Sequence, residues 1–218
     1  MGNYDFKYFF DNWSISHNQC QKIVKFVELI FTTSTQFNLT GHKTKRKIFD
    51  QLIVGGIVPY AGMKNFINSC HAILDVGSGA GIPGILLKIF FPKISVFLLE
   101  SSQKKCAFLR NTIGCLDLKK TFVLNQRAEN LQSQYCKYFD FVTARALAKM
   151  STCLKLMIPY LKFGGRIVLP KSDHSIDEYN QCKKILKSSH IKLIEIAKTS
   201  KIDSLFCYHT YVFTGINA

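Results

Sequence analysis

The sequence predicts an α/β protein with a seven-stranded, mostly parallel sheet, helices on both faces and a helical extension at the N-terminus. Short apolar runs alternate with helical segments from His71 onward, a pattern typical of right-handed βαβ units in an open sheet. A glycine-rich turn follows the first of these runs. The chain has 218 residues, and at about 150 residues per domain this length fits one domain with an extension.

The predicted strands are short runs rich in β-branched and aromatic residues. They span residues 72–76, 95–99, 121–125, 140–144, 166–170, 192–197 and 206–213. Helices are expected between them, at residues 82–90, 102–115, 149–161 and 176–189. Because the last two strands leave no room for a full helix between them, we expect the final strand to run antiparallel, at an edge of the sheet.

The region before the sheet has helical periodicity. Apolar residues in 17–31 recur at intervals of three and four, which predicts an amphipathic helix. A second helix is expected over 48–54, before a stretch rich in glycine and proline. We therefore expect residues 1–66 to form a helical extension packed on a core of residues 67–218, as one globular unit.

The charge balance is strongly basic. Lys and Arg number 29 against 14 for Asp and Glu, a net charge of +15, which favours a polyanionic partner such as nucleic acid or an anionic membrane surface. Only five of these cations are Arg, and the chain is rich in Lys, Ile, Asn and Phe. Compositional drift is therefore the alternative explanation of the charge.

The spacing of the cysteines and the residues of the N-terminus indicate the cellular compartment in which the protein is expected. None of the eight cysteines forms a C-x-x-C pair, and no Cys/His group has zinc-ligand spacing. The first residues lack the basic and apolar regions of a signal peptide, and the most apolar run, 82–91, is about half a membrane span. We expect a soluble, cytoplasmic monomer with reduced thiols, no metal and no membrane contact.

The glycine-rich turn reads LDVGSGAGIPG over residues 74–84. Glycines at 77, 79 and 81 allow a tight turn and let a ligand approach the backbone closely. In open parallel sheets, ligands bind beyond the carboxyl ends of the strands, where this turn must lie. The turn is therefore the predicted cofactor site.

Two cofactors compete for this turn. Gly79, Gly81 and Gly84 satisfy the dinucleotide pattern G-x-G-x-x-G, with Glu100 as the ribose-binding acid, which would make the protein a nicotinamide-dependent oxidoreductase. That register would extend the first strand and bury Asp75 within it, at a desolvation cost. If the strand ends at residue 76 instead, D-x-G-x-G-x-G begins at Asp75, which is the pattern of an S-adenosylmethionine (SAM) loop. We favour the SAM interpretation.

Seven separated segments carry a more specific resemblance. They are FNLTG (37–41), RKIFDQL (46–52), LDVGSGAGIPG (74–84), LLESSQKKCAFLR (98–110), QRAENL (126–131), FDFVTARAL (139–147) and GGRIVLPKS (164–172). With these segments the chain resembles the RsmG (GidB) family, which methylates N7 of a guanine in bacterial small-subunit ribosomal RNA. The resemblance implies a Rossmann-like, class I SAM-dependent methyltransferase that acts on 16S rRNA or on the small ribosomal subunit.

The resemblance also implies site residues. Cofactor-binding residues are expected at Asp75, Gly77, Gly79, Gly81, Ile82, Glu100, Ala128, Glu129 and Arg145. Among these, Glu100 would hold the ribose, and Ala128 and Glu129 would flank the adenine. The chain departs from the family at Ala80, where a proline is usual, and at Lys47 and Gln51, where the family has His and Ser. The last two departures leave the substrate contacts of 46–51 open.

Arg145 is the predicted catalytic side chain, because its planar guanidinium can hold a guanine O6 or a phosphate. A salt bridge to an acid such as Glu129 is the structural alternative. The other RNA-contacting candidates are Arg46, Lys47, Arg127 and Lys171; the alternative for each of them is a solvated or bracing cation. Clustered cations gain affinity for RNA by releasing condensed counterions.

The implied reaction needs no general base, because guanine N7 has a lone pair and carries no proton at neutral pH. Proximity and orientation can then supply most of the acceleration. The chain has neither the N-P-P-Y or D-P-P-Y segment of exocyclic-amine methyltransferases nor the Pro-Cys pair of cytosine C5 methyltransferases. Besides the oxidoreductase, the alternatives are a ribosome-binding module without catalysis and a methyltransferase acting on a protein or a small molecule.

Overall fold

The computed structural model describes residues 4–171, 175–199 and 208–216. The strands of this part form one sheet in the order β3-β2-β1-β4-β5-β7-β6. Their bounds are Ala72–Val76 (β1), Ser95–Leu99 (β2), Thr121–Leu124 (β3), Phe139–Thr143 (β4), Leu161–Lys171 (β5), Ile191–Thr199 (β6) and Tyr208–Gly215 (β7). The predicted seven-stranded, mostly parallel sheet is confirmed.

The last strand differs in position from the prediction. β7 runs antiparallel, as expected, but it pairs with both β5 and β6 and so lies inside the sheet, whereas β6 forms the edge. The side chains of Thr210, Tyr211, Val212 and Phe213 are all buried. Because the centre of β7 is apolar on both faces, an internal position covers more of it than an edge would. The predicted antiparallel edge is therefore wrong.

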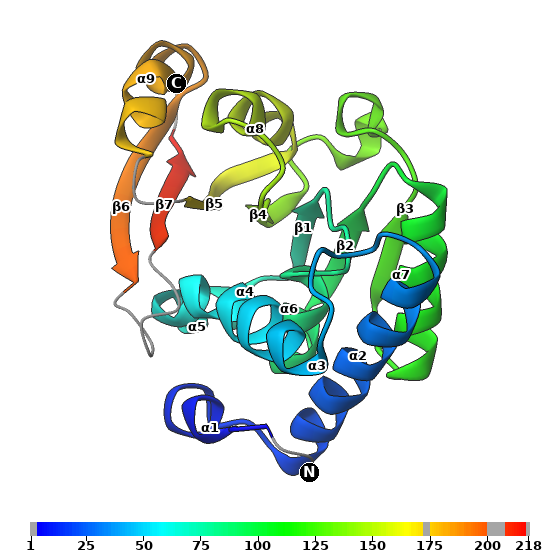
Figure 1. Ribbon diagram of the computed structural model, residues 1–218. Helices are drawn as coiled ribbons and strands as arrows, with labels where there is room; N and C mark the ends of the chain where they lie inside the picture. The colour runs from blue at the N-terminus through cyan, green and yellow to red at the C-terminus, as the bar shows by residue number, and fades with distance from the viewer. Residues whose placement is uncertain (1–3, 172–174, 200–207, 217–218) are drawn as a thin grey trace.

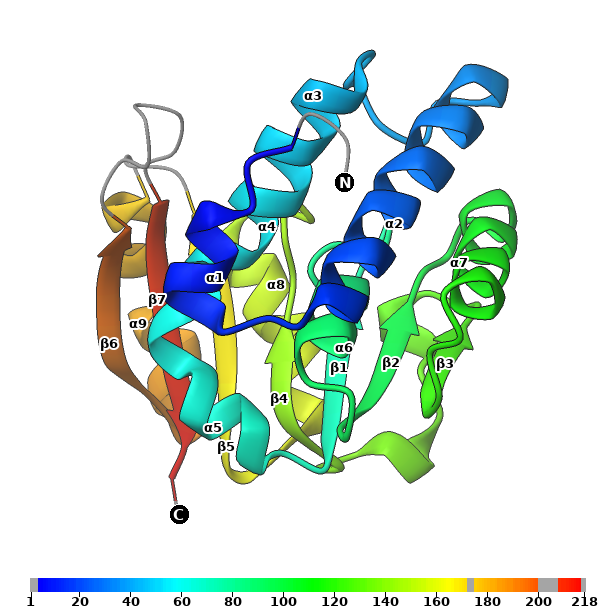
Figure 2. The same cartoon turned by 90° about the horizontal axis from the view of Figure 1, so that it is seen from below.

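Helices cover both faces of the sheet (Figures 1 and 2). One face carries α8 (Met150–Met157) and α9 (Ile176–Ser188), and a short 3₁₀ turn, Ile158–Tyr160, follows α8. The other face carries α6 (Gly84–Phe90) and α7 (Gln103–Cys115), over which the N-terminal helices pack. Each face has its own cluster of buried apolar side chains.

The N-terminal region consists of α1 (Lys7–Trp13), α2 (His17–Gln36), α3 (Lys45–Lys47), a π-helix (Ile48–Val54), α4 (Gly55–Ile57), a 3₁₀-helix (Val58–Met63) and α5 (Lys64–Ser69). The predicted helix at 17–31 is confirmed and continues to residue 36. It begins at a capping box in which Ser16 and Gln19 bond each other's backbone N–H groups. Its buried side chains join the same apolar cluster as those of α6 and β2.

Two contacts fix this helical layer against the end of the sheet that carries the site. A Cβ on Gly56 would lie 2.4 Å from the Ile82 side chain, so only glycine allows this close approach. The Tyr60 hydroxyl lies 2.8 Å from Thr143 Oγ1, which donates to the Val168 carbonyl. Tyr60 is therefore the donor to Thr143. This buried chain of hydrogen bonds joins the N-terminal layer to β4 and β5.

Cysteines and acids form no metal centre in the part of the chain that the structure describes. No group of three or more His, Cys, Asp or Glu side chains there is placed to hold a metal ion. The described cysteines are all free thiols. Within the same residues, no helix combines the length and apolarity that crossing a membrane requires.

Candidate functional site

The turn after β1 lies at the carboxyl end of the sheet and is held by its neighbours. The N–H groups of Gly77 and Ser78 both donate to the Leu99 carbonyl, at 2.8 and 3.1 Å. Gly77, Gly79 and Gly81 have φ values of +72°, +55° and +84°, a left-handed region that favours glycine. A Cβ on Gly79 would meet nothing nearer than the Gly77 carbonyl at 3.8 Å. The space above Gly79 is therefore open to a ligand.

A pocket of about 320 Å³ opens beside this turn. It lies between the turn, the end of β2 and the segments that follow β3 and β4. Its lining comprises Val76, Gly77, Gly79, Leu99, Glu100, Ser101, Lys105, Gln126, Arg127, Ala128, Glu129, Ala146, Leu147 and Leu156. The volume is at the lower end of the range for small-molecule sites. Five of the expected cofactor residues, Gly77, Gly79, Glu100, Ala128 and Glu129, thus come together around one space.

Glu100 joins the turn to the end of β2. Its Oε2 accepts the Gly79 N–H at 2.9 Å and its Oε1 accepts the Ser102 N–H at 2.8 Å. The side chain is 8% exposed and lines the pocket. An ionised carboxylate has about four acceptor positions, so two remain for hydroxyl groups of a ligand. This acceptor capacity fits a ribose with two neighbouring hydroxyls.

Asp75 lies under the turn, away from the pocket lining. Its Oδ2 accepts the Gly84 N–H at 3.0 Å, and its Oδ1 has no hydrogen-bond partner among the described residues. β1 ends at Val76, as the SAM register requires, yet Asp75 is completely buried. The argument that this register spares Asp75 from burial is therefore wrong. Burial raises the pKa of Asp75 to about 7.

Gly81 and Ile82 complete the loop but also face inward. A Cβ on Gly81 would lie 2.5 Å from the Ile85 side chain, so this glycine permits tight packing of the turn on α6. Ile82 is 7% exposed and belongs to the apolar cluster under the N-terminal helices. In the described chain, neither residue lines the pocket. Both shape the turn from beneath.

The segment after β3 forms the far wall of the pocket. Ala128 begins a short 3₁₀ turn, Ala128–Asn130, and its carbonyl accepts the Tyr160 hydroxyl at 2.7 Å. This bond holds the segment against the end of α8. Arg127 is exposed and lines the pocket beside Glu129. Ala128 and Glu129, the residues expected beside the adenine, therefore lie on a segment whose backbone is held by a hydrogen bond.

Arg145 follows β4 and joins three separate parts of the chain. Its Nη2 donates to the Gln51 carbonyl of the π-helix at 3.1 Å and to the Tyr208 hydroxyl at the start of β7 at 3.4 Å. No ion pair to Glu129 forms among the described residues. Arg145 is half-buried. Its guanidinium is held in place by two neutral acceptors, and it forms no ion pair with an acid in the described part of the chain.

A second pocket, of about 380 Å³, contains Arg145 and adjoins the first. It is lined by His42, Leu52, Arg145, Ala146, Pro170, Lys171 and Tyr208. Ala146 lines both pockets and has a left-handed φ of 53°. Burial, and then the charges of Arg145 and Lys47, lower the pKa of His42. Two spaces at the carboxyl end of the sheet thus meet at Ala146, one with the Glu100 carboxylate and one with the half-buried Arg145 guanidinium.

The remaining predicted cations differ in how freely they project. Lys171 is only 15% exposed and donates to the Ala148 carbonyl at 2.6 Å, beside Glu178 at 3.2 Å. Arg46 pairs with Asp50 at 2.5 Å across one turn, and Lys47 is exposed. Figure 2 shows α3, which carries both, at the end of the molecule toward which the parallel strands point.

Ala146, Leu147 and Tyr208 are among the pocket-lining residues that the sequence did not predict. Ala146 and Leu147 follow Arg145 in the A-R-A-L segment, and a Cβ on Gly77 would lie 2.6 Å from Leu147 Cδ1. A leucine in the loop that follows β4 is the sequence signal for this contact, since an apolar side chain there needs a partner. Tyr208 lies in the last strand, far from Arg145 in sequence. Only the internal position of β7 brings it there.

Comparison with known proteins identifies the family. The family model described as rRNA small subunit methyltransferase G (GidB) matches residues 19–206. The chain belongs to this family. The protein named ribosomal RNA small subunit methyltransferase G of Thermotoga sp. (strain RQ2) is 34% identical over 182 residues, covering 84% of this chain and 77% of that relative. The protein of the same name from Ureaplasma parvum serovar 3 is 32% identical over 173 residues, covering 79% and 81%.

The solved structures show the fold at lower identity. A SAM-dependent methyltransferase from Aquifex aeolicus aligns with a TM-score of 0.56 and 18% identity, covering 78% of this chain and 97% of that one. The sheet and its helices are therefore those of class I SAM-dependent methyltransferases, as the sequence predicted.

Proposed function

We propose that the protein transfers the methyl group of SAM to N7 of a guanine in 16S rRNA. The observation that carries the proposal is the pair of adjoining pockets at the carboxyl end of the sheet, in a member of the rRNA methyltransferase family. One pocket has the glycine turn and the Glu100 carboxylate. The other has the Arg145 guanidinium. A methyl donor in the first and a base in the second would meet at Ala146.

The residues of the first pocket fit SAM. Glu100 would accept the ribose hydroxyls at its two remaining acceptor positions, and the open space above Gly79 would hold the methionine part. Ala128 and Glu129 would flank the adenine, while Asp75, Gly81 and Ile82 hold the turn from beneath. When bound, SAM supplies an electrophilic methyl group on a sulfonium.

The second pocket supplies orientation for the acceptor base. The N7 lone pair lies in the plane of the guanine ring and is unprotonated at neutral pH, so no residue needs to remove a proton. Arg145 would donate to the guanine O6 or to a phosphate, with its fork already aligned by the Gln51 carbonyl and Tyr208. Aligning the lone pair with the methyl group is then the main contribution of the chain to the rate.

The cations at the rim would contact the RNA backbone. Lys47, exposed on α3, and Arg127, exposed at the mouth of the first pocket, are free to reach phosphates. Lys171 and Arg46 would first have to leave or share Glu178 and Asp50. We therefore rank Lys47 and Arg127 above Lys171 and Arg46 as phosphate contacts. We further propose that the protein acts as a monomer in the cytoplasm, where its ribosomal substrate is found.

Methyl transfer from labelled SAM tests the proposal. The purified protein is incubated with small subunits, and separately with naked 16S rRNA, from a strain lacking this activity, and the RNA is digested to nucleosides. Label in 7-methylguanosine is the expected result, and the better of the two substrates identifies the natural one. SAM binding without transfer to either RNA would move the substrate to another class of molecule. An absence of SAM binding would reopen the oxidoreductase and non-catalytic interpretations.

A further inference from the structure

The opposite end of the sheet carries a large basic groove. The amino ends of the parallel strands surround a hollow of about 600 Å³, whose lining includes Lys93, Lys120, Lys137 and Lys162. A second hollow of about 320 Å³ shares Lys137 and Lys162 and adds Phe163 and His190. Because the hollows share residues, they form one continuous surface, which we call the amino-end groove. It lies at the other end of the strands from the pockets described above.

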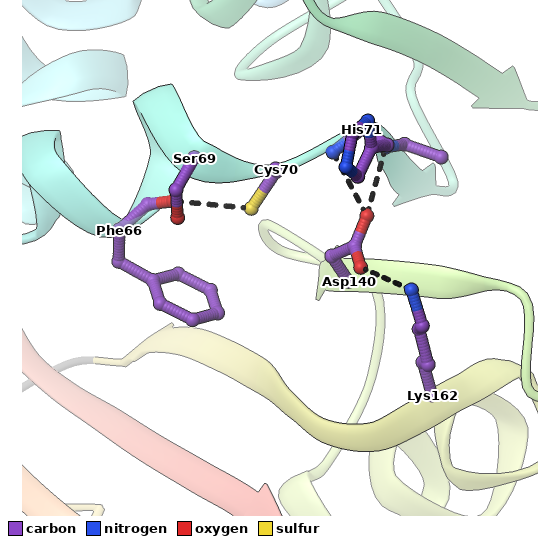
Figure 3. Close-up of polar contacts among 7 residues, drawn as sticks. Phe66, Ser69, Cys70, His71, Asp140 and Lys162 are labelled. Atoms are coloured by element: carbon purple, nitrogen blue, oxygen red, sulfur yellow. Dashed lines mark hydrogen bonds and ion pairs between the residues drawn. The ribbon is translucent and has the colours of Figure 1, made fainter.

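Most of the charge in the amino-end groove is unbalanced. Among the described residues, Asp140 is the one acid that lines either hollow, and both of its oxygens already accept hydrogen bonds, as Figure 3 shows. Oδ2 accepts the N–H groups of His71 and Ala72 at 2.9 and 3.0 Å, and Oδ1 accepts Lys162 Nζ at 3.1 Å. Lys93, Lys120 and Lys137 are exposed and pair with no acid among the described residues. Three lysine charges are therefore available to a polyanion.

Backbone conformation adds an independent observation. Lys120, Lys137 and His190, each directly before or near the start of a strand, have φ values of 53°, 49° and 53°. A lysine adopts this left-handed conformation at an energetic cost that glycine or asparagine would avoid. Backbone geometry thus gives no reason for lysine at 120 and 137. A ligand bound by the lysine ammonium group would account for lysine at these two positions.

Exposed aromatic rings lie beside these lysines. Phe163 is 60% exposed and Tyr138 is 46% exposed, and they line the two hollows that meet at Lys137. Lysines that follow a backbone, together with aromatic faces on which bases stack, are the two components of surfaces that bind unpaired nucleic acid. The groove combines both.

We propose that the amino-end groove binds a second segment of the rRNA, with phosphates on Lys93, Lys120 and Lys137 and an unpaired base stacked on Phe163. This proposal rests on the proposed function, because it takes rRNA as the substrate. A five-residue strand such as β1 spans roughly 17 Å, so the two ends of the sheet require RNA segments well separated in space. A large folded RNA provides such segments, and a short stem-loop around the target guanine does not.

A triple variant separates binding at the groove from folding. Lys93→Ala/Lys120→Gly/Lys137→Gly removes three charges, and the two glycines relieve the left-handed conformation. We expect an unchanged or higher melting temperature. We expect affinity for 16S rRNA to fall about tenfold or more and the slope of log K against log salt to become less steep by about 2, at ~0.7 per phosphate contact.

A matched control tests whether net charge alone is responsible. Lys25→Ala/Lys183→Ala/Lys184→Ala removes an equal number of positive charges from exposed positions of α2 and α9, outside both hollows. We expect a much smaller loss of affinity. An equal loss in the two triple variants, or no loss in the groove variant, would overturn the proposal.

Phe163→Ala tests the stacking part separately. The ring is mostly exposed, so its removal should leave the fold intact. We expect affinity for 16S rRNA to fall about fivefold or more, with the salt slope unchanged because no charge is lost. Wild-type affinity of this variant for 16S rRNA would refute the stacking of an unpaired base on Phe163.

Comparing two RNA substrates distinguishes this proposal from the proposed function. On full-length 16S rRNA the groove variant should lose kcat/KM, while on a short stem-loop around the modified guanine it should match the wild type. An equal loss on both substrates would mean that the groove acts through the catalytic pockets, which would overturn the proposal. If the wild type modifies neither RNA, the proposed function fails, and the affinity measurements above still decide whether the groove binds RNA.

Discussion

The two ends of the sheet are both basic, but their cations are held in different ways. At the carboxyl end, Arg145 donates to Gln51 and Tyr208, and Lys171 donates to Ala148 beside Glu178. At the amino end, Lys93, Lys120 and Lys137 project with no acidic partner in the described chain. The cations inside the carboxyl-end pocket are thus oriented by their neighbours, whereas these three amino-end lysines are not.

This difference suits two kinds of RNA contact. A reacting base must be held within fractions of an ångström of its productive position, which requires side chains locked by their neighbours. A phosphate backbone that only positions the RNA can be met by flexible lysines, whose affinity comes from counterion release. The comparison therefore predicts that carboxyl-end variants lose chemistry, whereas amino-end variants lose affinity and salt dependence.

The largest expected effect is the loss of SAM binding in Gly79→Asp. The side chain would enter the open space above the turn, the backbone is left-handed there, and the new carboxylate would lie near that of Glu100. We expect no SAM binding by calorimetry. Gly164→Asp is the control at the other end of the sheet, because Gly164 also has a left-handed φ, +72°, and open space around it. Retained micromolar affinity in Gly79→Asp would refute the assignment of the turn.

The next effect is a loss of methyl transfer in Arg145→Ala, by about 100-fold or more in kcat/KM, because misplacing the acceptor base is costly. SAM affinity should change little, because Arg145 lines the second pocket and not the pocket beside the glycine turn, and stability should fall by about 1 kcal/mol for the lost hydrogen bonds. Arg145→Lys keeps the charge but not the fork, so we expect only partial activity.

The matched control for Arg145 lies toward the amino end. Arg166 is also half-buried, and its guanidinium stacks 4.0 Å above the Phe66 ring. Arg166→Ala should lower stability while transfer to a short stem-loop stays at the wild-type rate. Normal turnover by Arg145→Ala would remove this residue from the site.

The sequence was sufficient for those parts of the molecule that local pattern decides. The strand ends at Val76 and Leu99 follow from apolar runs that stop at Gly77 and Glu100, and the glycine turn follows from its spacing. Gly77, Gly79 and Glu100 are predictable for the same reason, since parallel strands end at one edge, whereas Ala128 and Glu129 were implied only by the family resemblance. What these elements share is that their signals lie within a few residues of the structure they specify.

The features that the sequence did not predict depend on pairing between distant segments. Whether β7 enters beside β5 or at the edge depends on which apolar surfaces remain uncovered after folding, and Tyr208 meets Arg145 only as a result. The amino-end groove is built from loops before separate strands, so no one segment carries its pattern. The burial of Asp75 is likewise set by the layer of helices above it.

Asp75 and Asp140 allow the two ends of the sheet to be compared by the pH dependence of folding stability. Asp75 lies next to the last residue of β1, at the carboxyl end of the sheet, and burial raises its pKa to about 7. A folded-state pKa above the unfolded value of about 3.9 means that the contribution of Asp75 to stability falls as pH rises from about 4 to about 7.

Asp75→Asn keeps an oxygen for the Gly84 N–H without the charge. Relative to the wild type, its free energy of unfolding should improve by about 2 to 3 kcal/mol between pH 5 and pH 8, measured by urea unfolding. A pH-independent difference would show that Asp75 is ionised throughout.

Asp140, at the amino end, should show the opposite dependence with a smaller size. Partial burial acts to raise its pKa, but the N–H groups of Ala72 and His71 and the Lys162 ammonium outweigh it and hold the pKa below its usual value. The stabilisation is therefore present above the unfolded pKa and is lost as pH falls through the lower folded value.

Asp140→Asn should cost about 1 kcal/mol of folding stability at pH 7, because a charge-assisted bond and a half-exposed ion pair are lost. This cost should shrink toward pH 3. Urea unfolding at both pH values measures it. A cost that stays constant would mean that shape alone, and not charge, ties the start of β1 to β4.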